Sequence, residues 1–69
     1  MTSSEEIEAI HSIADDAAAS GDWKTLKLIS DYFRSRALGI QYRMRGLIAD
    51  ALVEESDAEH YADLLRERR

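Results

Sequence analysis

The sequence contains no cysteine, no proline and only three glycines among 69 residues. The absence of cysteine excludes disulfides and any metal site built from thiolates. The scarcity of proline and glycine, with 45% apolar residues, argues against disorder and against strands joined by tight turns. No apolar run approaches the roughly 20 residues of a membrane span, and the first residues resemble no export signal. The sequence therefore predicts a soluble, cytoplasmic, all-α protein.

The short length of the chain limits the stability that one chain can reach. A core of this size supplies roughly 3–5 kcal/mol, and small domains usually need disulfides, a metal or association with another chain. Cysteine-based solutions are excluded here, so association is the leading remaining source of stability. We expect a single domain over residues 1–69: a small helical bundle with a long central helix and two shorter flanking helices, completed by homodimerisation.

The apolar periodicity predicts three helices, over about residues 4–19, 22–54 and 57–68. Ser3 with Glu6, and Ser56 with Glu59, fit the capping box that begins a helix. Ser20 and Gly21 are a typical helix end. Asp22 is a suitable cap for the central helix.

The predicted central helix carries apolar side chains on two opposite faces. Its main stripe follows steps of three and four residues: Leu26, Ile29, Phe33, Ala37, Ile40, Met44, Leu47 and Ala51. The stripe keeps its phase through Gly39, and no capping residue follows that glycine, so we expect one continuous helix. The candidate oligomer or partner interface lies on the second face: Leu28, Tyr32, Gly39, Tyr42, Gly46 and Val53. Two short helices can cover one of these faces well. The uncovered face therefore predicts contact with a second copy of the chain or with another protein.

Charge changes sign twice along the chain. Residues 1–22 hold six acidic side chains and no Lys or Arg, residues 23–46 hold six basic and one acidic, and residues 47–69 hold seven acidic and three basic. The four arginines of the middle segment are Arg34, Arg36, Arg43 and Arg45. They can pair with carboxylates of the flanking helices, or they can bind an anion such as a nucleotide or another phosphate-bearing ligand. A net charge of −5 argues against nucleic acid as the partner.

The sequence contains no arrangement typical of catalysis. Glu8 with His11, and Asp57 with His60, have the i, i+3 spacing of di-iron carboxylate bundles, which also need inward carboxylates from two other helices. The centre of the middle helix offers arginines instead, so we expect no metal and no cofactor. Nucleophile-elbow glycines, a phosphate loop and a Ser/His/Asp spacing are all missing, and we expect that the protein is not an enzyme.

Two short stretches resemble known helical proteins. AASGDWKTL, residues 18–26, resembles the turn between the paired helices of tetratricopeptide-type proteins. LKLISDYFRSRALG, residues 26–39, is similar to the second helix of the small helical-hairpin inhibitors of sporulation kinases. Each resemblance covers a small part of the chain, and each implies protein binding. The spare apolar face favours a small interaction module that regulates or inhibits another protein, in the manner of phage or mobile-element accessory proteins.

Overall fold

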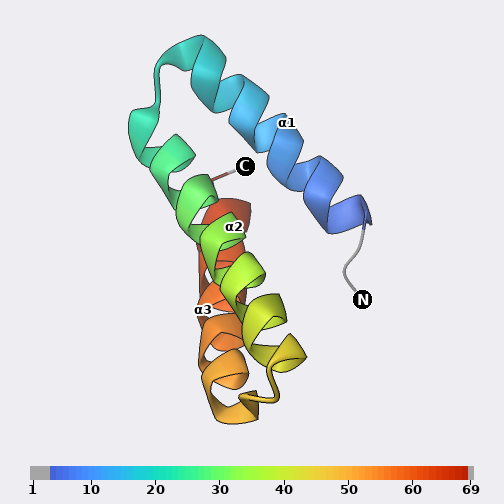
Figure 1. Cartoon of the computed structure of the whole chain (residues 1–69). Helices are drawn as coiled ribbons and strands as arrows, with labels where there is room; N and C mark the ends of the chain where they lie inside the picture. Colours follow the sequence, from blue (N-terminus) through green and yellow to red (C-terminus); the bar gives the residue numbers. More distant parts are fainter. Residues whose placement is uncertain (1–3, 69) are drawn as a thin grey trace.

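The computed structural model describes residues 4–68, which fold into three α-helices (Figure 1). Their bounds are Ser4–Ser20 for α1, Trp23–Met44 for α2 and Ile48–Arg66 for α3. Residues 4–68 contain no strand, so the predicted all-α class is confirmed. Ser3, the predicted cap of the first helix, lies outside the described residues.

The three helices share one small core. α2 and α3 run antiparallel as a hairpin, and α1 lies beside the half of the hairpin that is remote from the α2–α3 turn (Figure 1). The buried core cluster draws on all three helices: Ile10, Ile13, Ile29, Tyr32, Ala58, Ala62 and Leu65. The half of the hairpin near the α2–α3 turn has no third helix over it in Figure 1, and Ile40, Ile48 and Leu52 are exposed there.

The α2–α3 turn is a Schellman motif centred on Gly46. This glycine has a φ of 77°, its N–H donates to the carbonyl of Arg43 at 3.0 Å, and the N–H of Leu47 donates to the carbonyl of Tyr42 at 2.9 Å. These two bonds satisfy the last carbonyls of α2 and reverse the chain. The predicted single helix over residues 22–54 is therefore wrong. The break falls at the second glycine of that segment.

The predicted third helix also has different bounds in the structure. α3 begins directly after Leu47, whose side chain makes no capping hydrogen bond. Ser56 and Glu59, predicted to begin a helix, lie inside α3 with exposed side chains. The spacing of a capping box can also occur on the exposed face of a continuous helix, because serine and glutamate are both tolerated there.

The α1–α2 turn follows the predicted signals. α1 ends at Ser20, Gly21 has a φ of 74°, and Asp22 caps α2. The Asp22 carboxylate accepts hydrogen bonds from the backbone N–H of Thr25 at 3.2 Å and from its hydroxyl at 2.6 Å. The hydroxyl bond is the main cause that lowers the pKa of Asp22. Arg68 donates to the Thr25 hydroxyl oxygen at 2.7 Å and so ties the segment after α3 to this cap.

Small residues allow α2 and α3 to approach closely. A Cβ atom placed on Gly39 would lie 3.3 Å from Cγ of Glu55 and 3.8 Å from the carbonyl oxygen of Ala51. Ser35 is buried on the same side of α2, and Ala51 is fully buried on α3. The face of α2 that packs against α3 is therefore the face with little side-chain volume, because backbones approach most closely where side chains are small.

Candidate functional site

A continuous exposed stripe runs along the side of α2 that faces away from α3. Its residues recur at alternating steps of three and four: Trp23, Leu26, Ser30, Phe33, Ala37, Ile40 and Met44. We call this set the outer stripe. Trp23, Ile40 and Met44 are 65%, 58% and 83% exposed. The spacing is that of a coiled-coil seam, in which every large apolar residue packs against a neighbouring helix. Leu26 and Phe33 are 36% and 37% exposed, so the chain covers them in part, and the stripe is most open at Trp23, Ile40 and Met44.

The structure exchanges the roles predicted for the two faces of the central segment. The buried or half-buried members of the predicted partner interface are Leu28, Tyr32, Gly39 and Tyr42, and its exposed members are Gly46 and Val53. Tyr32 and Gly39 are thus occupied by the chain's own helices. Most of the predicted main stripe faces water instead, and its buried members are Ile29 and Ala51.

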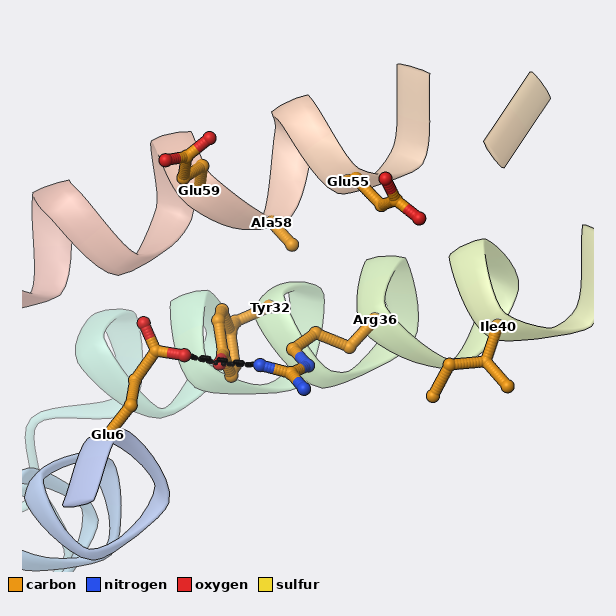
Figure 2. Close-up of a pocket in the computed structure, with 7 residues that line it drawn as sticks. All are labelled: Glu6, Tyr32, Arg36, Ile40, Glu55, Ala58 and Glu59. Carbon is orange, nitrogen blue, oxygen red and sulfur yellow. Dashed lines mark hydrogen bonds and ion pairs between the residues drawn. The ribbon is translucent and has the colours of Figure 1, made fainter. Parts of the chain in front are cut away.

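A polar cluster around Glu6 joins α1 to the hairpin. Figure 2 shows the Glu6 carboxylate pointing from α1 toward Tyr32 and Arg36 of α2. Tyr32 donates its hydroxyl to Oε2 of Glu6 at 2.7 Å, Nη1 of Arg36 donates to the same oxygen at 3.1 Å, and Nη2 of Arg66 donates to Oε1 at 3.2 Å. Burial, and secondly the bond to the carboxylate, raise the pKa of Tyr32. The cluster holds α1 in place.

An open cavity of about 290 Å³ adjoins this cluster (Figure 2). Its lining residues are Glu6, Tyr32, Arg36, Ile40, Glu55, Ala58 and Glu59. The lining includes three carboxylates, of which Glu6 is taken by Tyr32 and Arg36, and it offers no serine, cysteine or histidine. The cavity thus presents no nucleophile with an adjacent base.

The four arginines of the predicted anion site lie in different surroundings. Arg36 is paired with Glu6, and Arg43 forms a two-point pair with Glu55 through Nε and through Nη2, the latter at 2.8 Å from Oε1. The hydrogen bond from Arg43 lowers the pKa of the Glu55 carboxyl. Arg34 and Arg45 form no ion pair with any residue in the range 4–68. Two of the four arginines are therefore already paired with carboxylates of the chain.

The residues weighed as metal ligands do not converge. His11 and His60 are exposed, and no three His, Asp or Glu side chains in the described part of the chain are placed to hold a metal ion. None of the helices formed by residues 4–68 has the length and hydropathy needed to cross a membrane.

Sequence reasoning missed Trp23 as part of the exposed surface. Trp23 is 65% exposed and opens the outer stripe, three residues before Leu26. The available signal was the strict alternation of three- and four-residue steps from Trp23 to Met44, because a seam of this regularity serves helix–helix packing.

The comparisons with known proteins returned nothing: the chain matches no protein-family model, no curated protein and no solved structure.

Proposed function

We propose that the chain is a small, non-enzymatic protein-binding module that regulates another protein by docking the outer stripe of α2 onto it. The observation that carries this proposal is the exposure of Trp23, Ile40 and Met44 along one seam of a helix whose opposite face is packed. Monomeric proteins seldom expose large contiguous apolar surfaces, and those that do generally use them for binding. A regulator of the phage or mobile-element accessory type is one setting in which such a module acts.

The size of the stripe supports binding through a helix–helix contact. α2 has 22 residues, which correspond to roughly 33 Å at 1.5 Å per residue. That length is about three heptads, enough for an amphipathic helix to lie against it. Full burial of a side chain such as Ile40 or Met44 favours association by about 1.5–3 kcal/mol before the entropic cost of binding is subtracted.

A matched pair of variants tests this function. Ile40 is 58% exposed on the outer stripe, and Val53 is 59% exposed on α3 away from it. Both can be changed to glutamine with little effect on folding. We expect a protein captured by the wild-type chain and by Val53→Gln to be lost with Ile40→Gln. Capture that is equal for all three chains would reject the outer stripe as the binding surface.

Homodimerisation, which the sequence predicts, is the competing use of an exposed stripe. Sedimentation at micromolar concentration tests it directly. A homodimer through the outer stripe would become a monomer of 7.8 kDa in the Ile40→Gln variant. A wild-type chain that is already monomeric at that concentration would contradict it. The phosphate-ligand alternative has less support, because Arg36 and Arg43 are paired within the chain.

A further inference from the structure

The charged side chains of α2 nearest the outer stripe are all basic. At roughly 100 degrees per residue, Lys27 and Arg34 lie along one border, and Arg36 and Arg43 lie along the other. Asp31 is the acidic residue of α2, and it lies farther from the stripe, 3.8 Å from Nζ of Lys27. A partner that covers the stripe therefore meets basic groups at its edges.

The two borders differ in how far the chain already neutralises them. Arg36 and Arg43 are bound by Glu6 and Glu55. On the other border, the Lys27 side chain is 71% exposed and its contact with Asp31 is long. Arg34 shares a shallow polar hollow with Asp31, Glu54 and Asp57, but none of these carboxylates comes within ion-pair distance of it. The Lys27–Arg34 border is thus the one that can still take up carboxylates.

The chain's own α1 shows how this fold receives an acidic helix. Ile10 and Ile13 enter the core while Glu6 accepts hydrogen bonds from Arg36 and Arg66 at the edge of the contact. Apolar side chains at the centre and carboxylates against arginine at the border are the arrangement that an outside helix would repeat on the outer stripe. Ser30 and Ala37, which are small, alternate there with larger residues and leave room for a partner's apolar side chains.

We infer that the partner of the outer stripe is an amphipathic α-helix with acidic side chains along the edge that meets Lys27 and Arg34. This inference rests on the proposed function and adds the chemistry of the partner. A second copy fits the charges less well. Two outer stripes packed in parallel or antiparallel would each place basic borders against basic borders, and like charges across an interface disfavour association. The net charge of −5 opposes an acidic partner at long range, but a Debye length of about 8 Å at physiological salt leaves the nearest groups dominant.

Two synthetic helical peptides test the inference. Both peptides have the length of α2 and the same apolar seam. In each heptad, one core position is leucine and the other is alanine. The acidic peptide carries glutamate at both bordering positions, and the basic peptide carries lysine. Trp23 is the single tryptophan of the chain and lies on the outer stripe, so its emission reports docking without a label.

We expect the acidic peptide to bind about fivefold more tightly than the basic peptide at physiological salt, from two exposed charge pairs of ordinary strength. The preference should shrink at about 1 M salt, where the Debye length is about 3 Å. In the double variant Lys27→Glu with Arg34→Glu, the order of the two peptides should reverse. Such a reversal reports charge matching at this border and does not follow from a change in folding.

Other outcomes overturn the inference in distinguishable ways. Equal affinities for the two peptides, both weakened by Ile40→Gln, would show that the stripe docks helices without selecting acidic ones, so the proposed function would stand and the inference would fail. A wild-type dimer that Ile40→Gln converts to monomer, with no peptide binding, would make a second copy the occupant. If neither peptide changes the Trp23 emission and Ile40→Gln leaves protein capture unchanged, the proposed function fails as well.

Discussion

Replacing Gly46 by alanine distinguishes the hairpin from a continuous rod by the sign of the stability change. In the structure Gly46 has a φ of 77°, and a Cβ atom there would meet nothing within 4 Å. The change is therefore purely conformational. An L-residue in this region costs about 1–2 kcal/mol, and the stiffer unfolded chain returns about 0.4–1 kcal/mol. We expect the free energy of unfolding to fall by about 1 kcal/mol.

A continuous helix through Gly46 would give the opposite result. Alanine inside a helix is more stable than glycine by about 0.5–1 kcal/mol, so the substitution would then stabilise the protein. For a domain of this size, about 1 kcal/mol corresponds to a change of about 4–8 °C in Tm. Thermal and urea unfolding followed by far-ultraviolet circular dichroism can resolve that difference. A rise in Tm for Gly46→Ala would refute the hairpin.

Two other glycines supply controls for this measurement. Gly21 has a φ of 74° with open space around it, so Gly21→Ala should lower the Tm as Gly46→Ala does. Gly39 lies inside α2, where alanine gains helix propensity but places its Cβ 3.3 Å from Cγ of Glu55. These effects oppose each other, and we expect Gly39→Ala to remain within about 0.5 kcal/mol of the wild type.

Three further predictions follow from the polar contacts. Tyr32→Phe removes the hydroxyl that binds Glu6, which should lower the free energy of unfolding by about 1–2 kcal/mol. The pKa of Tyr32 is raised from 10.0, so the wild type should keep this contribution to stability below pH 10 and lose it as the pH rises further. Tyr32→Phe should show no such loss of stability, and alkaline denaturation curves of the two proteins can test this difference. Asp22→Ala should destabilise α2 more than Asp22→Asn does, because asparagine still caps the helix through the backbone of Thr25; equal Tm values would contradict this role. The pKa of Glu55 is lowered from 4.5, so its contribution should be present above that pH and lost below it, and Glu55→Gln should flatten the acid limb of a urea-midpoint profile.

The helical class and the first turn could be predicted because their signals are local. The end of α1 near Gly21 and the cap at Asp22 depend on residues within one turn of each other. The α2–α3 turn could not be placed in the same way. The apolar pattern keeps its phase across Gly46, and α3 begins without a capping side chain. Gly39 followed by Ile40 and Gly46 followed by Leu47 both have the pattern of a Schellman motif, so the pattern alone does not place the turn.

The assignment of the two faces of α2 required information that periodicity does not contain. Both faces are apolar at helical spacing, and the outer stripe has the larger side chains. The packed face is the one that contains Gly39, which allows close approach, and Tyr32, which is 1% exposed and whose hydroxyl is hydrogen-bonded to Glu6 and Arg36. These are properties of three-dimensional packing between helices. A count of apolar residues favours the opposite face.

Thiol labelling of single-cysteine variants tests most directly that the inner face of α2 is packed and its outer stripe is open. The native chain has no cysteine, so each variant carries one reporter. Ile40→Cys places it on the outer stripe, and Ser35→Cys places a nearly isosteric thiol on the buried face. We expect the thiol of Ile40→Cys to react at close to the rate of the unfolded chain, and that of Ser35→Cys to react at least about tenfold more slowly, because it must wait for the hairpin to open. Rapid labelling of Ser35→Cys together with protection of Ile40→Cys would contradict the account.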